Sequence, residues 1–251
     1  MRNFAAVCIG QKYPPNVYVE NLWLGLNQYV TGPFQLTILT DDPENTYFHD
    51  RPIRTVRAPN WELSDSRLFW WYKMFLFSPQ MGLNGEVLYL DLDTIIIGNL
   101  DKFFDYSTNF CICQDFNRKW IHDYAMSNSS VFKFNTHRDV FLWEKFNSDK
   151  MFNIKKYRGD QDFITQNMLK KKCNWWPREW AMSFKWEIFQ GGLIKSGTGL
   201  DSKGNFPADD AKYHTPDQPW VIPSDCSIIV YHGKPDPTDT VCFQALRPQL
   251  Q

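Results

Sequence analysis

The sequence has no excess of charge of one sign, and this absence excludes one large class of function. Its 27 Lys and Arg residues nearly balance its 28 Asp and Glu residues, which gives a net charge of −1. Proteins that bind nucleic acid through its phosphate backbone carry a basic surface field. We therefore expect no nucleic-acid partner.

The sequence also has no long apolar run and no zinc-type cysteine spacing. No window reaches the length that crosses a bilayer, so we expect no transmembrane segment. The first residues, M-R-N-F-A-A-V-C-I-G-Q-K-Y, reach polar positions too early for a secretory signal peptide. Cys111 and Cys113 are one residue closer together than the usual zinc pair. Cys8 lies in an apolar run, as buried free thiols do. Together these features predict a cytoplasmic protein with reduced thiols.

The patterning that is present indicates an α/β fold. An apolar run at 4–9 predicts a strand, helical spacing at 17–30 predicts a helix, and 35–39 predicts a second strand. A strand, a helix and a strand with short connections form a βαβ unit, hence a parallel strand pair. There is no internal repeat or clear linker, so we expect one domain over 1–251, with a mixed, mostly parallel sheet flanked by helices. Further strands are predicted near 53–56, 110–114, 125–134 and 227–231, and further helices at 66–78, 138–146 and from 160 to 169.

The stretch from Glu86 to Asp105 carries the strongest chemical signal. An apolar run, Val87–Leu90, ends on Asp91 and Asp93. Side chains alternate along a strand, so these two carboxylates share one face while Leu92 points the other way. Two close carboxylates repel each other and are costly to bury unless a cation neutralises them. The alternative is a simple Asp turn, but the apolar runs on both sides favour a site for a divalent metal ion.

Other polar residues follow predicted strands or begin predicted helices. His232 ends the last strand and is followed by Gly233 and Lys234, an arrangement suited to holding a diphosphate beside a metal. Two carboxylates and an imidazole suit Mn²⁺ better than Mg²⁺, although both ions fit. Asp41 follows the second strand, where it binds a ribose or base or simply forms a turn. Lys73 lies in the aromatic helix before the central strand, where it reaches water or faces a phosphate.

The order of these motifs resembles that of the GT-A glycosyltransferases, and most of all glycosyltransferase family 8, the glycogenin and bacterial galactosyltransferase group. The resemblance spans residues 4 to 235 and rests on four short motifs. In L-Y-L-D-L-D-T-I-I-I-G-N-L-D it implies that Asp91 and Asp93 bind Mn²⁺ and that Leu92 lies with the donor. In Y-H-G-K-P it implies that His232 binds the metal, with Gly233 and Lys234 at the diphosphate.

The other two motifs concern the sugar. S-N-S-S-V-F-K-F resembles the family's Asn-Ser-Gly strand, which implies that Asn128 lines the sugar and acceptor side, with Ser130 where glycine is usual. G-D-Q-D resembles its Asp-Gln-Asp segment, which implies that Asp160 and Gln161 hold the donor sugar; these two are also the nearest candidates for a catalytic role. The resemblance also places the segment from Cys8 to Tyr13, which includes Ile9 and Gly10, around the base and ribose together with Asp41. It places Lys73 near the diphosphate.

The implied reaction moves a sugar from a nucleotide donor, a UDP-sugar, to a hydroxyl of a glycan, a lipid-linked molecule or a protein, with retention of configuration. The nucleotide-binding half covers about 1–105, and the half for the donor sugar and the acceptor covers about 106–251, with a Gly/Pro-rich loop at 190–220 that we expect to act as a lid.

Three alternatives use the same residues. One is a carbohydrate- or nucleotide-binding protein without turnover. Another is a nucleotidyltransferase, for which a glycine-rich loop is expected after the first strand, where this chain has G-Q-K-Y-P-P. A metal-dependent phosphohydrolase needs more ligands than the five histidines offer. The cluster of Trp175, Trp176, Trp180 and Trp186 either faces a glycan or a partner or fills the core.

Overall fold

The computed structural model describes residues 1–46, 51–63, 65–116, 126–168, 171, 173–188, 222–233 and 236–246. Within these residues the main sheet has seven strands in the order β3-β2-β1-β4-β7-β6-β8. Four neighbouring pairs are parallel, and β7 is antiparallel to both of its neighbours. The strands are β1 (Arg2–Cys8), β2 (Phe34–Thr40), β3 (Ile53–Arg57), β4 (Glu86–Leu90), β6 (Phe110–Gln114), β7 (Ser127–Asn135) and β8 (Cys173–Trp175).

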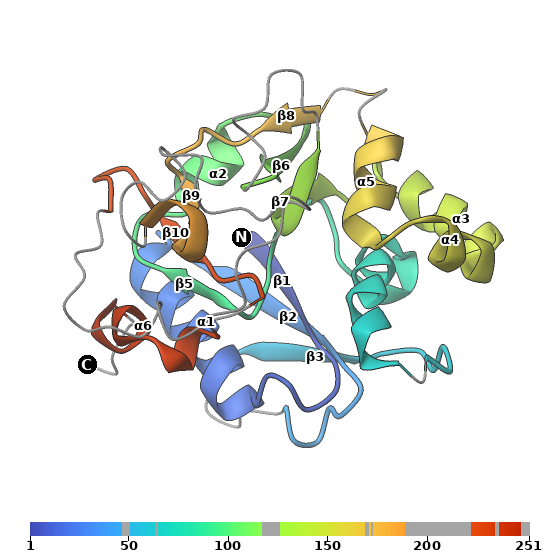
Figure 1. Ribbon diagram of the computed structural model, residues 1–251, viewed down its shortest axis with the longest axis horizontal. Helices are drawn as coiled ribbons and strands as arrows, with labels where there is room; N and C mark the ends of the chain where they lie inside the picture. Colours follow the sequence, from blue (N-terminus) through green and yellow to red (C-terminus); the bar gives the residue numbers. More distant parts are fainter. Residues whose placement is uncertain are drawn as a thin grey trace, which may run out of the picture.

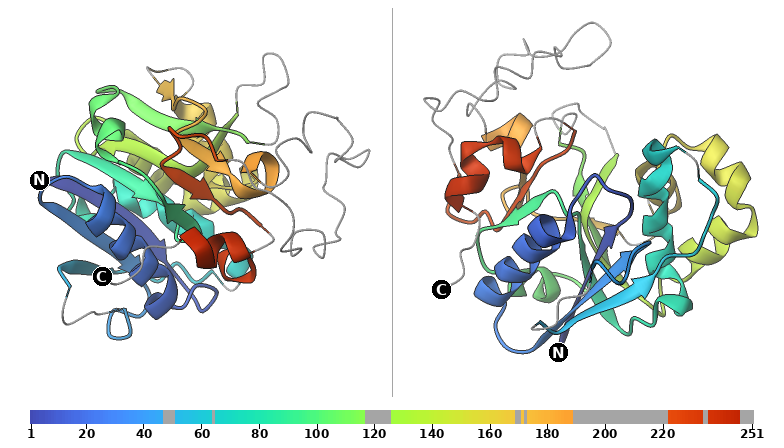
Figure 2. Two further views of the ribbon diagram at one scale, coloured as in Figure 1. Left: turned by 90° about the vertical axis from the view of Figure 1, so that its left-hand side faces the viewer. Right: turned by 90° about the horizontal axis from the view of Figure 1, so that it is seen from below.

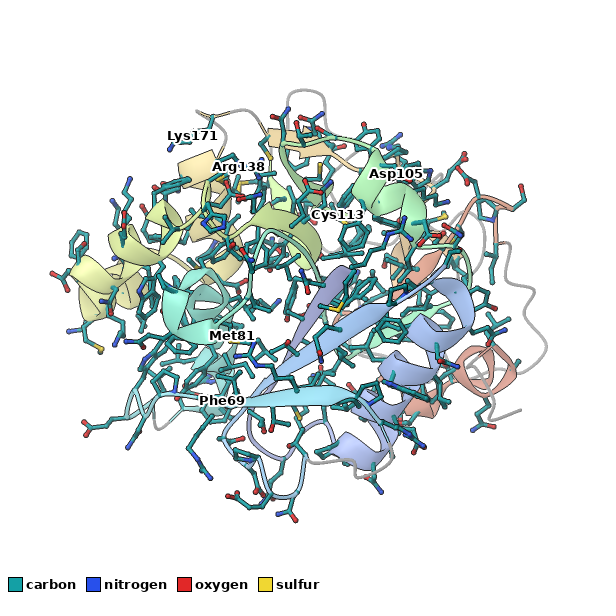
Figure 3. All side chains as sticks on the ribbon, turned by 180° about the vertical axis from the view of Figure 1, so that it is seen from behind. Phe69, Met81, Asp105, Cys113, Arg138 and Lys171 are labelled. Carbon is teal, nitrogen blue, oxygen red and sulfur yellow. The ribbon has the colours of Figure 1, made fainter. Side chains whose placement is uncertain are left out.

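Helices cover both faces of this sheet (Figures 1 and 2). The helix α1 (Pro15–Tyr29) and the short α2 (Asp101–Asp105) contribute to one core layer. The opposite layer contains the 3₁₀ helix η1 (Ser66–Phe77), α3 (Phe141–Ser148), α4 (Lys150–Lys156) and α5 (Asp160–Met168). Phe69 and Met81, the latter at the end of the 3₁₀ turn η2 (Pro79–Met81), belong to this second layer (Figure 3).

The central strands are apolar because both of their faces are covered. Phe4, Ala5 and Ala6 of β1 are fully buried, and Leu88 and Tyr89 of β4 are buried beside them. Such continuous apolar runs are typical of parallel strands that lie between two helix layers. The predicted mixed, mostly parallel sheet flanked by helices is confirmed.

A second, three-stranded sheet connects the end of the chain to the central stretch. Among the described residues, β10 (Ile228–Val230) lies between β5 (Thr94–Ile96) and β9 (Ala181–Ser183). The pairing continues past the strand, since the Tyr231 amide donates to the Asp93 carbonyl at 2.9 Å. The π-helical turn η3 (Phe184–Ile188), the 3₁₀ turn η5 (Pro237–Asp239) and α6 (Val241–Leu246) complete this region. No helix among the described residues is long and apolar enough to cross a membrane.

The structure differs from the sequence expectations in a few elements. The helix expected from residue 138 begins at Phe141, because side chains hold a turn before it. The Asn135 side chain accepts from the amides of His137 and Arg138, and Asp139 accepts from the Asn135 amide. The elements β5, β8, β9, α2, α4 and α6, which are each three to seven residues long, were not predicted. The expected loop at 190–220 lies outside the described residues.

Gly25 lets α1 pack closely on β5, and this contact gives a test of the packing. A Cβ at Gly25 would lie 2.8 Å from the Cβ of Ile96, which is close to the backbone and cannot easily move away. Gly25→Ala gains about 1 kcal/mol of helix propensity but overpacks the interface by about 1–3 kcal/mol. We expect the free energy of unfolding to fall in urea denaturation. Asn27→Ala, on the exposed side of α1, is the control and should change it by less than about 0.5 kcal/mol; a stabilised Gly25→Ala variant would contradict the packing.

Candidate active site

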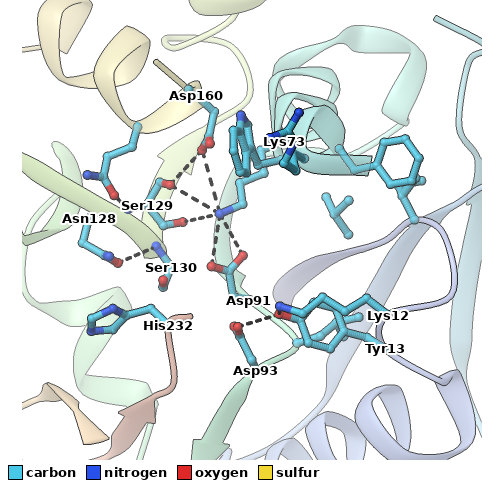
Figure 4. Close-up of a pocket in the computed structure, with 18 of the residues that line it drawn as sticks. Lys12, Tyr13, Lys73, Asp91, Asp93, Asn128, Ser129, Ser130, Asp160 and His232 are labelled. Atoms are coloured by element: carbon cyan, nitrogen blue, oxygen red, sulfur yellow. Dashed lines mark hydrogen bonds and ion pairs between the residues drawn. The ribbon is translucent and has the colours of Figure 1, made fainter. Parts of the chain in front are cut away.

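A cavity of about 860 Å³ opens at the carboxyl ends of β1 and β4 (Figure 4). In an open α/β sheet this edge is where ligands bind. Because β7 runs antiparallel to β4, its first residues reach the same edge, and the Asp91 amide donates to the Ser130 carbonyl at 2.8 Å. The cavity wall contains most of the residues that the sequence predicted, namely Ile9, Gly10, Tyr13, Lys73, Asp91, Leu92, Asp93, Asn128, Asp160, Gln161 and His232.

Lys73 occupies the centre of this wall. Its side chain enters from η1 and is almost completely buried. The ammonium nitrogen Nζ lies 2.8 Å from Asp91 Oδ1 and 3.8 Å from Asp160 Oδ2, and it donates to the Ser129 carbonyl at 3.2 Å and to Ser129 Oγ at 3.3 Å. Burial by itself would lower the pKa of Lys73, but the carboxylates of Asp91 and Asp160 outweigh it and raise the pKa. Lys73 is therefore a charged group bound by the protein's own acids.

The negative charge of Asp91 is compensated by several neighbouring groups. Besides Lys73, it accepts a hydrogen bond from the Tyr89 hydroxyl at 2.5 Å. Tyr89 lies two residues earlier on the same strand, so strand alternation places both side chains on one face. The Thr94 hydroxyl donates to the Asp91 carbonyl at 2.8 Å and fixes the turn that follows β4.

The negative charge of Asp93 is compensated much less than that of Asp91. It is 9% exposed, and one of its oxygens accepts from the Tyr13 hydroxyl at 2.8 Å. Burial and the nearby Asp91 carboxylate raise the pKa of Asp93 to about 7, against smaller opposing effects of Tyr13, Lys12 and Lys73. A buried carboxylate with a raised pKa is stabilised by an added cation. Leu92 between the two aspartates is 2% exposed and belongs to the core layer of α1, as alternation predicts.

His232 reaches the cavity from the far end of the chain. Its Nε2 lies 2.7 Å from Ser183 Oγ, and its ring stacks on Phe116 with 5.6 Å between centroids. Burial, and secondarily the charge of Lys185, lowers the pKa of His232 to about 4. The imidazole is therefore neutral at pH 7, which is the form that ligates metals. Among the described residues, however, no three His, Cys, Asp or Glu side chains converge as a ready metal site.

The second half of the site is built around Ser129, which sequence reasoning did not single out. Ser129 Oγ donates to Asp160 Oδ2 at 2.7 Å, and the Ser129 amide donates to Gln161 Oε1 at 3.4 Å. Burial raises the pKa of Asp160, although Lys73 and Ser129 partly offset it. Asn128 Oδ1 accepts from the Ser130 amide at 2.9 Å. The signal for Ser129 was its place between Asn128 and Ser130 at the start of a strand.

The residues expected around a nucleotide divide into two groups. Ile9, Gly10 and Tyr13 line the cavity, whereas Cys8 and Asp41 support them from behind. The Gly10 amide donates to both Asp41 oxygens at 3.1 and 3.2 Å. Gly10 has a φ of +72°, and a Cβ there would lie 2.9 Å from the Phe69 ring, so glycine is required. Burial, and secondarily Asp41, raises the pKa of the Cys8 thiol to about 12, so it is unreactive.

Gln11 and Lys12, which belong to the predicted nucleotide segment, also line the cavity, as do Ser130 and Asp162 of the two sugar motifs. The sequence predicted no role in the site for the other lining residues, which are Val7, Ser66, Arg67, Phe69, Trp70, Tyr89, Asp115, Arg158 and Gly159. Gly233, with a φ of +75°, follows His232 outside the lining, and Lys234 lies outside the described residues. Three tryptophans of the aromatic cluster pack inward rather than lining the cavity. Trp176 is buried and donates to the Val131 carbonyl, Trp180 packs against Phe103 with the two rings tilted, and Trp175 packs on the η1 layer.

No protein-family model matches the chain, and no curated protein matches its sequence. Among solved structures the chain is similar to the crystal structure of the glycosyltransferase GlyE in Streptococcus pneumoniae TIGR4. The TM-score is 0.56 and the sequence identity is 14%, over 94% of this chain and 56% of that one. At this identity the likeness establishes the shared α/β fold, and the chain spans just over half of the neighbour's length.

Asp93 predicts a pH dependence of stability in the metal-free protein. Its folded-state pKa of about 7 exceeds the unfolded value of about 3.9, so the folded state binds the extra proton between these values. The contribution of Asp93 to the free energy of unfolding should therefore fall as the pH rises from 4 to 7, by on the order of 2–4 kcal/mol. Because the lowered pKa of His232 makes an opposite contribution over this range, the contribution of Asp93 is read from the difference between the parent and Asp93→Asn. Asp93→Asn should remove that fall, as measured by urea denaturation in chelator. Asp105→Asn, at an exposed position on α2, is the control, and equal pH profiles for Asp93→Asn and the parent would contradict the assignment.

The ion pairs of Lys73 lead to a second prediction, which concerns the free energy of unfolding. Lys73→Met leaves Asp91 and Asp160 buried without their cation and should lower the free energy of unfolding by about 3–5 kcal/mol. Lys73→Met combined with Asp91→Asn should recover part of that loss, because one uncompensated charge is gone. Lys155→Met, on the exposed side of α4, is the matched control. If the single and double variants unfold at the same urea concentration, the ion pair is not the source of the loss.

Proposed function

We propose that the protein is a metal-dependent glycosyltransferase of the GT-A type, which moves a sugar from a UDP-sugar to an acceptor hydroxyl with retention. The observation that carries the proposal is the meeting of Asp91, Asp93, Lys73 and Asp160 in one cavity at the carboxyl edge of the sheet. The fold shared with a solved glycosyltransferase supports it. So does the order of the four motifs, which places acids for a metal before polar groups for a sugar.

Asp91, Asp93 and His232 are the residues that would hold the metal, with Mn²⁺ preferred over Mg²⁺. Asp93 fits this role because its buried charge has little compensation, and His232 fits because its imidazole is neutral. A bound divalent ion supplies charge neutralisation to the departing diphosphate. Asp91 shares its oxygens with Lys73 and Tyr89, so its part as a ligand requires these groups to yield an oxygen.

The remaining residues bind and orient the donor. Ile9, Gly10 and Tyr13 form the wall for the nucleotide, with Asp41 fixing the Gly10 amide. Lys73 lies between Asp91 and Asp160, where its charge faces both the diphosphate side and the sugar side. Gly233 and Lys234 are assigned to the diphosphate by their place in the motif.

The donor sugar lies at the α5 side of the cavity in this proposal. Asp160 and Gln161 begin α5 and would accept hydrogen bonds from sugar hydroxyls, and Asn128 lies across from them. Ser129 holds Asp160 in place through its hydroxyl. In a retaining transfer the acceptor hydroxyl approaches from the face that the diphosphate leaves, and its proton passes to the diphosphate.

A second candidate function is binding of the nucleotide-sugar without turnover. The observation that favours it is the Lys73–Asp91 ion pair of 2.8 Å, which already neutralises one proposed metal ligand. The two candidates differ in whether donor binding depends on a divalent ion, since binding alone needs no ion to stabilise a leaving group.

The first experiment is thermal unfolding with UDP, GDP, CMP or ADP, each with Mn²⁺ and with chelator. UDP with Mn²⁺ should raise the free energy of unfolding by about 2.7 kcal/mol when the ligand is at 100 times its Kd, and UDP with chelator should not. Asp93→Asn should abolish the increase while keeping its fold by circular dichroism, whereas Asp105→Asn should respond as the parent does.

Each outcome separates the candidates. Stabilisation by UDP regardless of chelator favours the binding protein. Stabilisation by another nucleotide with Mn²⁺ keeps the transferase and changes its donor. The absence of a response to any nucleotide would rule out both.

A further inference from the structure

A large aromatic side chain is exposed at the rim of the cavity. Trp70 is 42% exposed, and it is the one cavity-lining residue among the exposed large hydrophobic side chains of the described chain, which are Met1, Trp70, Tyr106, Met151 and Phe152. Its neighbour Trp71 is fully buried. The indole of Trp70 thus presents apolar surface to the cavity, although the same helix buries the adjacent ring.

The indole of Trp70 packs against the residue that precedes α5. A Cβ at Gly159 would lie 3.2 Å from Trp70 Nε1, so the indole rests against the Gly159 backbone. The next residue is Asp160, which the proposed function assigns to the donor sugar. A ring that covers Trp70 would therefore lie beside the donor sugar, which is where an acceptor hydroxyl must be to receive it.

The charges around Trp70 favour an uncharged ligand. Arg67 on η1 pairs with Asp65 at 2.8 Å, and Arg158 pairs with Asp162 at 2.6 Å. Each guanidinium on this rim has its own carboxylate, so the rim offers no net positive charge to a phosphate or an acidic chain. Both arginine side chains are more than 70% exposed, and with Asp162 they supply polar groups that hydrogen-bond to hydroxyls.

We propose that Trp70 is the stacking platform for an uncharged sugar ring of the acceptor, so that the acceptor is a neutral glycan. A sugar ring has an apolar C–H face that covers an aromatic ring and hydroxyls at its edge that reach the flanking polar groups. A large rigid ring loses little conformational entropy when it is covered. This inference rests on the proposed function, because it places the acceptor relative to Asp160.

The test is binding of the full chain to an array of neutral and charged glycans, in the presence of UDP and Mn²⁺. The parent should bind one or more neutral glycans. Trp70→Ala should weaken that binding about tenfold, in the range of a lost aromatic stacking contact, and Trp70→Phe should restore most of it. Phe152→Ala, at an exposed aromatic of α4 outside the cavity lining, is the control and should bind as the parent does. Nucleotide-dependent stabilisation should change less than twofold in apparent Kd for all three variants.

Three outcomes would overturn the inference while leaving the proposed function intact. These are equal neutral-glycan binding by the parent and Trp70→Ala, binding only of charged glycans, and no glycan binding in a protein that UDP and Mn²⁺ still stabilise. Loss of the nucleotide response in the parent itself is a failure of the proposed function, and the thermal measurement detects it separately.

Discussion

The buried ammonium of Lys73 is the interaction on which the site depends. The carboxyl edge of the sheet gathers Asp91, Asp93 and Asp160 in a small volume, and like charges there would repel one another. One lysine lies within 3.8 Å of two of these acids. The aromatic helix η1 brings it there, because the buried rings around it anchor the backbone from which Lys73 extends. The position of Lys73 in the polar site therefore depends on the packing of the hydrophobic layer that contains η1.

The strand order decides which other residues join the acids. Since β7 runs antiparallel to β4, its beginning rather than its end reaches the cavity, and Asn128 and Ser129 lie beside Asp91. The small sheet has a similar effect, because β10 pairs with β5 directly after the Asp93 turn and delivers His232. Both pairings join segments far apart in sequence at the same edge. The acidic residues proposed to bind a metal ion therefore lie next to the polar residues proposed to bind the sugar.

The acidic side chains of this site differ in how far their negative charge is compensated, and this difference indicates where a cation would bind. Asp91 shares its charge with Lys73 and Tyr89, whereas Asp93 has a pKa near 7 and His232 is neutral. The side of the cavity with the least compensation is the one proposed to take a cation. On the opposite side, around Trp70, each rim guanidinium is paired with a carboxylate, and we propose that this side takes an uncharged sugar ring.

The sequence by itself determined the central strands, α1, α5 and the acidic edge. Long apolar runs and helical spacing are local signals, and the Asp91–Asp93 pair follows from strand alternation alone. It did not determine the short elements β5, β8, β9 and α4, which carry too few residues for a periodic signal. Only the tertiary structure decided that Lys73 faces acids rather than water, that Tyr13 donates to Asp93, and that Ser129 and Trp70 belong to the site. These contacts depend on the order of the strands in the sheet and on how η1 packs against α5. Local sequence patterns do not report either, because both are set by residues far apart in the chain.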